Sequence, residues 1–454
     1  LIIGSSLLIG LPVDAQTSPI PRGNEPNPNI DRFPQPLPTP LPLPPEDTTP
    51  ITPAPPTREP IPESPPVNIF VRKVEVVGST VLSEKEIADI IKPIEGNSVT
   101  LKKLQDVASQ ITRLYTSKGY ITSRAVLADQ TITDGIVKIF VIEGTLEKIE
   151  VQGTRRLNKS YVRSRIRLGV KRPLQPQKIE EQLRLLKFDP AIADIVDATL
   201  KPGTKIGQSI LSVKVKEADS VSGFLGVDNY SPPSVGSERL GSVISFRNPI
   251  GVGDELSASY YRSTAGGSNS FDFNYRVPIN PMNGTIQLRY APSDSKIIRS
   301  EFSDDFDITS DRELYEISYR QPLVRNLREE FALSLAFSLQ DGQSFLDGIP
   351  TPFGDGPDNQ GNSKTRVLKF GQDYIKRDSK GAWALRSQFN VGIDVFDATV
   401  NGDSKPDGRF FSWLGQVQRA QQLGKNNLLI AQAELQLSTN GLLSSQQFLI
   451  GGGQ

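Results

Sequence analysis

The chain has 454 residues, and its 51 Lys and Arg balance its 51 Asp and Glu, so net charge gives no reason to expect a nucleic acid as partner. It contains no Cys and no His, which excludes disulfides, thiolate or imidazole metal sites, and every catalytic system with a histidine base. An enzyme would be left with carboxylate, Lys or Tyr chemistry, and no carboxylates are arranged for it. We therefore predict a protein that is not an enzyme and has no cofactor, no metal and no catalytic residue.

The N-terminal segment LIIGSSLLIGLPVDAQ joins an apolar run to a small-residue ending at Ala15 that is typical of a signal-peptidase site. We expect residues 1–15 to be the remainder of a signal peptide, with an ordinary buried apolar segment as the alternative. No later stretch has the roughly 18 apolar residues of a spanning helix. An exported chain of this kind would reside in a membrane only through β-strands.

A proline-rich segment follows at residues 16–67, where residues 17–67 hold 19 of the 36 prolines. Such a composition favours an extended, polyproline-type linker over helix or sheet. A binding role for the prolines is the less favoured alternative.

An internal repeat begins after the linker. Val71–Leu82 reads VRKVEVVGSTVL, and Leu146–Leu157, 75 residues later, reads LEKIEVQGTRRL. Each copy starts with an alternating strand that a glycine turn ends, and two helices and two strands follow. We predict two β-α-α-β-β domains, over residues 68–145 and 146–219.

The boundaries expected inside the repeats follow from apolar periodicity. The helices are expected at Ser83–Ile91 and Asn158–Ile166, each followed by a longer one, and the later strands at Tyr120–Leu127, Gly135–Ile142, Ile192–Leu200 and Gln208–Lys216. Gly119 is expected to end the longer helix of the first copy in a left-handed conformation.

From residue 220 onward the chain changes to strands that alternate apolar and polar residues along their whole length, as in FDFNYRV and FALSLAFSLQ. Eleven such strands are expected, near residues 221–230, 239–247, 254–262, 270–277, 284–292, 312–320, 330–340, 365–375, 382–397, 408–420 and 427–438.

The connections between these strands favour a membrane barrel over a soluble β-domain. The even-numbered connections are short, as in NPIGVGD and KRDSKGA, whereas several odd-numbered ones are long and polar. Short turns at one rim and long loops at the other are typical of an outer-membrane barrel with a polar lumen. Since single-chain barrels normally have an even number of strands, we expect the barrel over residues 220–454 to continue past Gln454 and not to close as given.

Several motifs in order resemble one family. YTSKGYITSRAVL (Tyr115–Leu127) and Ile179–Val215 resemble polypeptide-transport-associated (POTRA) domains, and DNYSPPSVGSERLG and FRNPIGVGDELSASYYRS resemble the first barrel strands of two-partner secretion transporters, the haemolysin secretion/activation proteins. The resemblance covers roughly residues 68–454. It implies two POTRA domains followed by an incomplete barrel, with about 11 of 16 strands present.

The same resemblance interprets the C-terminal QQFLIGGGQ. In this family such a run leads into a Val-Arg-Gly signature on the sixth surface loop, which folds back into the lumen. Phe448, Gly451 and Gly452 would belong to this sixth-loop lead-in, and Gln454 would stop just before the arginine.

For function, the resemblance implies an outer-membrane pore whose periplasmic POTRA domains bind a large secreted exoprotein, haemolysin-like or adhesin-like, while it is unfolded. The expected partners are this exoprotein and outer-membrane lipid, and the protein is expected to be a monomer. The family's N-terminal plug helix has no counterpart in the periodicity of residues 16–67.

Two sets of residues are candidates for contact with the exoprotein. The first is a strand edge that an extended client could extend through its main chain, or that is satisfied inside its own domain: Tyr120, Ile121, Thr122, Arg124 and Val126. The second is a basic patch, which is either a solvated face or a funnel for acidic client or lipid headgroups: Arg155, Arg156, Arg163, Arg165, Arg167, Lys171 and Arg172.

Two other functions stay open at this stage. A barrel-assembly factor usually has more than two repeats. A surface enzyme or adhesin on a barrel anchor would need a further domain or a catalytic group.

Overall fold

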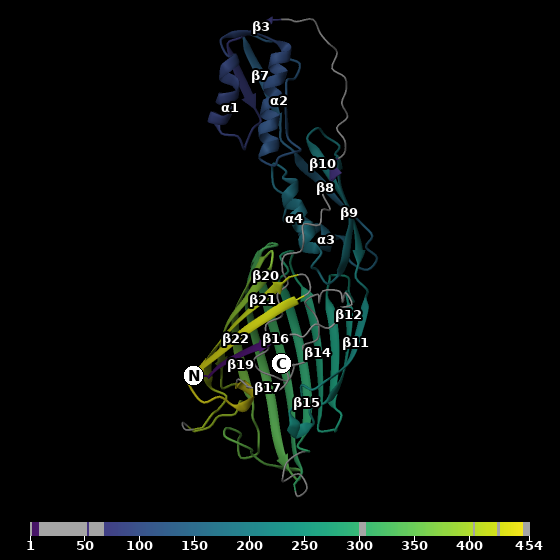
Figure 1. The fold of residues 1–454 in the computed structure, drawn as a ribbon, viewed down its shortest axis with the longest axis vertical. Coiled ribbons are helices and arrows are strands. Elements are labelled where there is room, and N and C mark those ends of the chain that lie inside the picture. The colour runs from purple at the N-terminus through teal and green to yellow at the C-terminus, as the bar shows by residue number, and fades with distance from the viewer. Residues whose placement is uncertain are drawn as a thin grey trace. The chain divides into compact units, whose positions relative to one another are not determined.

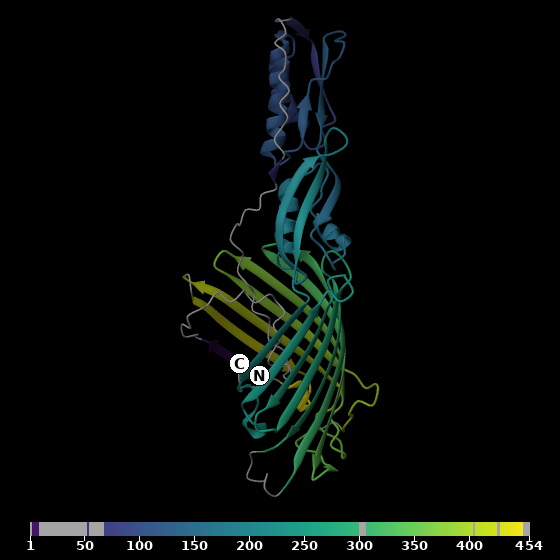
Figure 2. The same cartoon turned by 90° about the vertical axis from the view of Figure 1, so that its right-hand side faces the viewer.

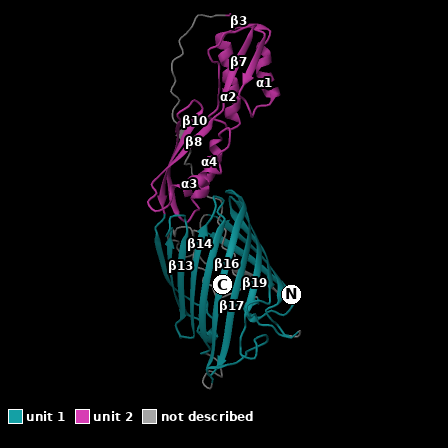
Figure 3. Ribbon diagram, turned by 180° about the vertical axis from the view of Figure 1, so that it is seen from behind, with its two compact units in different colours: residues 1–47, 218–454 teal, residues 48–217 magenta. Residues whose placement is uncertain are grey.

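The computed structural model describes residues 2–8, 52–53, 68–298, 306–402, 405–424 and 427–447. The chain divides into two compact units, residues 48–217 and residues 1–47 with 218–454 (Figure 3). In the described ranges, no helix is both long enough and apolar enough to cross a membrane.

The first repeat has the predicted β-α-α-β-β order. Its elements are β4 (Lys73–Val77), α1 (Glu84–Ile91), α2 (Leu101–Ser117), β6 (Arg124–Val126) and β7 (Ile136–Ile142). β7 lies in the middle of the sheet, parallel to β4 and antiparallel to β6. A second, two-stranded ladder of β3 (Asn68–Val71) and β5 (Asn97–Thr100), with the short helix η1 (Lys92–Ile94) before β5, was not predicted.

The second repeat has the same topology. Its elements are β8 (Thr145–Gln152), α3 (Lys159–Arg167), α4 (Pro176–Leu186), β9 (Ile192–Pro202) and β10 (Gln208–Glu217). β10 lies between β8, to which it is parallel, and β9, to which it is antiparallel. The two-residue β2 (Thr52–Pro53) adds to the outer edge of β9.

Each repeat has its own apolar core. In the first, Leu104, Ile111 and Tyr115 of α2 are fully buried against the sheet, and in the second, Ile179 of α4 and Ile166 of α3 are fully buried in the same way. Each core joins the helices of one repeat to its own strands. Residues 68–217 therefore contain what they need to fold without the rest of the chain.

The turn after the first strand is stabilised in the same way in both repeats. Gly78 and Gly153 have φ of +91° and +87°, a left-handed conformation that glycine adopts without strain. A glutamate at the end of the last strand then binds the turn: Glu143 accepts from the backbone N–H of Thr80 at 2.6 Å, and Glu217 accepts from that of Arg155. The predicted glycine turns are confirmed, whereas the glutamates were not foreseen.

The unit formed from residue 218 onward contains eleven consecutive antiparallel strands, as predicted. They are β11 (Val221–Asp228), β12 (Arg239–Arg247), β13 (Glu255–Ser263), β14 (Ser268–Pro278), β15 (Thr285–Lys296), β16 (Ile308–Arg325), β17 (Glu329–Leu346), β19 (Thr365–Asp378), β20 (Gly381–Gly392), β21 (Phe410–Leu423) and β22 (Asn427–Ser438). Each strand pairs with its neighbours in sequence and the sheet curves as one wall (Figures 1 and 2).

Three further short elements lie in the described part of residues 218–454: β18 (Ile349–Pro350), which pairs with β17, and the 3-10 helices η2 (Pro233–Val235) and η3 (Ser444–Gln446). The apolar segment expected to be a signal peptide forms β1 (Ile2–Leu8), which pairs with β22. The expected cleavage position after Ala15 lies outside the described residues. Among the strands described, β1 and β11 are the two ends of the sheet.

The two faces of this sheet differ as the alternation predicts. One face carries large apolar side chains that are exposed in the isolated chain, such as Phe273, Leu335 and Trp383 at 44%, 57% and 45%. The opposite face carries small or polar buried side chains, such as Ser338 and Gln416. An exposed apolar face opposite a polar one is the arrangement of a barrel wall between lipid and a solvated lumen.

The connections alternate in length, as predicted for most of them. The turns after β12, β14, β16, β19 and β21 are short, and the one after β19 leaves only residues 379–380 between strands. The connections at the other rim include the long segments 347–364 and 393–409. The connection between β13 and β14, residues 264–267, is a short exception at the long-loop rim.

Candidate functional site

The predicted strand edge of the first repeat is shorter than expected. Only Arg124–Val126 is a strand, because the chain turns directly after α2 at Gly119 (φ +87°). In this turn Tyr120 N–H donates to Tyr115 O at 3.0 Å and Gly119 N–H to Thr116 O at 2.9 Å. The chain then turns again, with Ser123 N–H bonded to Tyr120 O at 2.9 Å. Of the predicted set, Tyr120, Ile121 and Thr122 therefore lie in a turn and not on an edge.

The outer edge of β6 is covered by its own domain. The hydroxyl of Thr112 on α2 accepts from the N–H of Ala125 at 2.9 Å and lies 3.5 Å from the Ala125 carbonyl. Where β6 ends, the side chain of Gln130 pairs with both backbone groups of Lys138 on β7, at 2.7 and 2.8 Å. A client strand at this edge would have to displace both side chains.

The corresponding edge of the second repeat is longer. β9 has 11 residues, and Val196 on it is 52% exposed. The described partner on its outer side is β2, which runs parallel and pairs at Thr199 and Leu200. An extended segment of the chain thus already adds to this edge through its main chain, which shows that the edge has the geometry for strand addition.

The seven residues of the predicted basic patch do not form one surface. Arg165 is 5% exposed: its guanidinium lies 3.4 Å from the centroid of the Tyr161 ring and 3.4 Å from Asp189 Oδ2. Including it in an exposed patch was wrong, because Asp189, 24 residues downstream, supplies a buried counter-charge. Arg155 and Arg156 lie in the turn that Glu217 binds.

The remaining members are separated by their positions around α3. Lys171 and Arg172 are exposed beyond its C-terminal end. Arg163 and Arg167 line a groove between α3 and β8, and two lysines that were not predicted, Lys148 and Lys159, line it with them. The spacing of Lys159, Arg163 and Arg167 at every fourth residue of a helix was a signal in the sequence that they share a face.

The segment after β22 folds against the polar face of the sheet. Leu442 packs on Val367 and Phe410, whose side chains lie on that face, and Leu443 is 1% exposed. Gln446 is 4% exposed; its amide nitrogen lies 3.2 Å from Thr365 Oγ1, and its backbone oxygen accepts from Gln436 at 2.8 Å.

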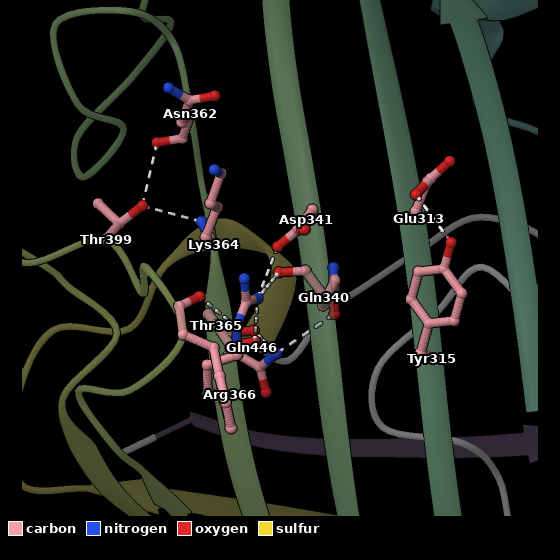
Figure 4. Close-up of polar contacts among 11 residues, drawn as sticks. Glu313, Tyr315, Gln340, Asp341, Asn362, Lys364, Thr365, Arg366, Thr399 and Gln446 are labelled. Atoms are coloured by element: carbon pink, nitrogen blue, oxygen red, sulfur yellow. Dashed lines mark hydrogen bonds and ion pairs between the residues drawn. The ribbon is translucent and has the colours of Figure 1, made fainter.

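Figure 4 shows this network beside the loops of the long rim. The side-chain amides of Gln446 and Gln340 lie 3.4 Å apart, and Arg366 donates to Asp341 at 2.6 Å and to the carbonyl of Phe396 at 3.0 Å. The contacts of Gln446, with the packing of Leu442, hold the segment Leu442–Gln447 against the polar face of the wall. The lead-in residues Phe448, Gly451 and Gly452 themselves lie outside the described residues.

Charges on the polar face are paired with one another across the strands. Arg289 lies 2.6 Å from Asp272, Lys369 2.6 Å from Glu316, and Arg386 2.8 Å from Asp373. These side chains are at most 22% exposed. At these three positions the charges of the wall are therefore compensated. Among the residues described, no group of three or more acidic side chains is placed to hold a metal ion.

The fold defines a class of protein: two β-α-α-β-β domains followed by an antiparallel, barrel-type sheet. A family model for the POTRA domain, ShlB-type, matches residues 69–144, and a model for the haemolysin secretion/activation protein ShlB/FhaC/HecB matches residues 207–454. The second model covers more than half of the chain. The chain belongs to the haemolysin secretion/activation protein family, and the predicted resemblance is confirmed.

Named relatives agree with this assignment. The outer membrane transporter CdiB of Escherichia coli is 24% identical over 84% of this chain and 64% of its own length, so the chain spans less than two thirds of that relative. The heme/hemopexin transporter protein HuxB of Haemophilus influenzae is 30% identical over 38% of this chain and 30% of its own. The solved structure of CdiB from Escherichia coli has the same fold, with a TM-score of 0.63, 23% identity, and coverage of 87% of this chain and 74% of the other.

These matches place the chain in the outer membrane, with its POTRA domains in the periplasm. The family is one of transporters.

Proposed function

We propose that the chain is the transporter of a two-partner secretion system, which captures a large exoprotein unfolded in the periplasm and passes it through the barrel to the cell surface. The observation that carries this proposal is the outer edge of β9, an 11-residue strand to which the short β2 of the same chain adds in parallel. A client bound there by its main chain is recognised as an extended chain, independently of most of its side chains.

The wall of the sheet supports the same function. An unfolded polypeptide carries charges of both signs, and isolated charges in the lumen would retain some of its segments. Because Arg289, Lys369 and Arg386 each have a carboxylate partner on the wall, their charges are compensated at these positions and attract a passing segment less strongly. This arrangement suits transport of an extended chain better than selection of a small ion.

The rest of the proposal follows from this role. The exported protein acts as a monomer surrounded by outer-membrane lipid, after cleavage of residues 1–15, and catalyses no reaction. The segment from Tyr120 to Val126 is the second candidate for client contact, since it also ends in an edge strand, but binding there requires Thr112 to move away.

The absence of Cys from the chain allows a direct test by cross-linking. Residues 68–217 carrying Val196→Cys on β9, Arg124→Cys on β6, or Arg172→Cys outside both edges are mixed with the unfolded N-terminal segment of the secreted protein encoded beside this one, with single cysteines along it. The proposal predicts disulfide formation at Val196→Cys well above the level at Arg172→Cys, and loss of it when proline interrupts the client segment.

The other possible results of this test would favour a different capture site or a different function. Cross-linking at Arg124→Cys and not at Val196→Cys would show that the first repeat binds the client. Equal cross-linking at all three positions would contradict capture at a strand edge. Preferential cross-linking to unfolded barrel proteins would favour a barrel-assembly factor, and a catalytic or adhesive domain in the full-length protein would favour the third alternative.

A further inference from the structure

A second surface of the second repeat combines an open strand edge with positive charge. The groove between β8 and α3 has a volume of about 460 Å³. One side is the backbone of β8 from Lys148 to Gln152, and the other is the helix face with Lys159, Arg163 and Arg167. Among the described strands β8 is the last of its sheet, so its outer edge pairs with no other strand.

One contact shows that the edge opens into this groove. Arg163 Nε donates to the carbonyl oxygen of Ile149 at 3.1 Å. That carbonyl belongs to β8, the edge strand, and Arg163 belongs to α3. Arg163 therefore occupies a position where the backbone N–H of an added strand would donate, so an added strand would have to displace it from this carbonyl, which leaves its guanidinium to pair with a carboxylate of that strand.

The spacing of the charges matches that of a strand. Lys159, Arg163 and Arg167 lie four residues apart on a helix, which separates them by about 6 Å along the axis. Alternate residues of a strand lie about 6.6 Å apart and point to the same face. The spacing of the three basic residues therefore matches that of three alternate side chains on one face of a strand added to β8.

The β8 side of the groove carries less net charge than the α3 side. Lys148 and Glu150 project from the opposite face of β8 and pair with each other at 2.8 Å, and this pairing lowers the pKa of Glu150 and raises that of Lys148. The uncompensated charge of the groove is therefore on the α3 side.

We propose that this groove binds an extended peptide segment with acidic side chains at alternate positions, which adds as a strand to β8 and places its carboxylates against Lys159, Arg163 and Arg167. The proposal rests on the proposed function in one respect: the segment would belong to the secreted partner. The charges specify the register of the segment, whereas the β9 edge accepts an extended chain with little regard to sequence.

The test measures the binding of fluorescent ten-residue peptides to residues 68–217 by anisotropy. One peptide has Glu at every second position with Val and Thr between, and a second has the same composition with the Glu residues grouped at one end. Two more peptides repeat the first with N-methyl groups on either the odd-numbered or the even-numbered residues. The protein variants are the double substitution Arg163→Gln with Arg167→Gln and the matched control Lys171→Gln with Arg172→Gln, which removes equal charge outside the groove. Thermal unfolding confirms that each variant is folded.

The proposal predicts that the alternating peptide binds at least about tenfold more tightly than the grouped peptide and than one of the two N-methylated registers. The groove variant weakens this binding about tenfold, and the control variant leaves it within about twofold. Equal affinity for the alternating and the grouped peptide would overturn the proposal, and so would an equal loss of affinity in the groove variant and the control variant. Either result would mean that non-specific electrostatic attraction explains the binding.

A further arm separates peptide from membrane. Vesicles of phosphatidylcholine with phosphatidylglycerol are titrated with the same variants. Binding to vesicles through Arg163 and Arg167, without binding of the alternating peptide, would overturn the proposal in favour of a lipid-headgroup surface. Cross-linking at Val196→Cys does not depend on this groove. If the peptides fail to bind the groove, the proposed function still stands, and if cross-linking at Val196→Cys fails, binding of acidic peptides to the groove can still be observed.

Discussion

The hydroxyl of Thr112 accepts a hydrogen bond from the backbone N–H of Ala125 at 2.9 Å, and this side chain occupies the outer edge of β6 at that residue. The same hydroxyl donates to the carbonyl of Ala108 at 3.0 Å within α2. The helix therefore takes the place that an added strand would occupy. In the second repeat, the described partner at the corresponding edge is the short β2.

Removal of this hydroxyl should open the edge of the first repeat. Thr112→Val leaves the N–H of Ala125 without its partner, at a cost of about 1–3 kcal/mol in unfolding free energy. Amide hydrogen exchange at Ala125 should become faster, and cross-linking of client at Arg124→Cys should increase. In the control Thr116→Val, the lost hydroxyl donates only to the Thr112 carbonyl at 3.1 Å, so exchange at Ala125 should not change. Unchanged exchange in Thr112→Val would show that the helix does not close the edge.

The buried group of Arg165, Tyr161 and Asp189 should be essential to the second repeat. Tyr161 donates to Asp189 Oδ2 at 2.7 Å, and Asp189 is 2% exposed. Asp189→Asn removes the carboxylate that lies 3.4 Å from the buried guanidinium of Arg165, which should lower the unfolding free energy of residues 68–217 by about 3–5 kcal/mol in urea titrations. Asp194→Asn is the control, since the Asp194 side chain is 57% exposed and 3.9 Å from Lys187; it should cost less than about 1 kcal/mol.

The first repeat should lose stability in acid through Glu86. The hydrogen bond from Lys118 (2.6 Å), with those from Ser83 at the start of α1, lowers the pKa of Glu86 from 4.5 to about 2. Because the pKa of Glu86 is lower in the folded state, its ionised carboxylate stabilises the fold at pH values above the ordinary pKa of 4.5. This stabilisation is lost as the pH falls through about 2.

The corresponding measurement is urea unfolding of residues 68–217 between pH 6 and pH 2, with and without Glu86→Gln. The difference in unfolding free energy between the two proteins should be constant above about pH 5 and shrink toward pH 2. Glu84→Gln removes a neighbouring carboxylate that is not part of the capping pair and serves as the control. A difference that does not depend on pH would contradict the role of the Glu86 charge.

The ion pairs of the polar wall should behave as coupled units. Lys369→Met leaves Glu316, whose side chain is 18% exposed, without its partner at 2.6 Å and should destabilise the sheet by about 2 kcal/mol or more. Thermal unfolding of the full chain in detergent should show the loss, and adding Glu316→Gln should recover part of it. Lys296→Met is the control, because its pair with Asp307 is about half exposed.

Much of the fold could be predicted because its signals are local. The alternation in FALSLAFSLQ places Leu335 and Ser338 on opposite faces, and the structure confirms it. Gly78 and Gly153 occupy the same position in the two repeats, and they mark turns whose left-handed backbone conformation glycine adopts without strain.

The errors concern contacts between distant residues. YITSRAVL alternates like a strand, but its first half turns because the end of α2 bonds to Tyr120. Arg165 resembles its exposed neighbours in sequence, and only the fold brings it to Asp189. The positions of Thr112 beside Ala125 and of Gln446 beside Thr365 likewise depend on tertiary structure that no local pattern specifies.

The central claim, capture and export of a secreted partner, is tested most directly in cells that lack this gene and produce the partner encoded beside it. The measurement is the amount of partner accessible to antibody on intact cells after restoring the full-length protein, or a version without residues 68–217. We predict that the partner reaches the surface only with the full-length protein, while unrelated barrel proteins are present at normal levels in every strain. Detection of the partner on the surface of cells that lack this protein would contradict the account. A general loss of other barrel proteins from those cells would contradict it as well.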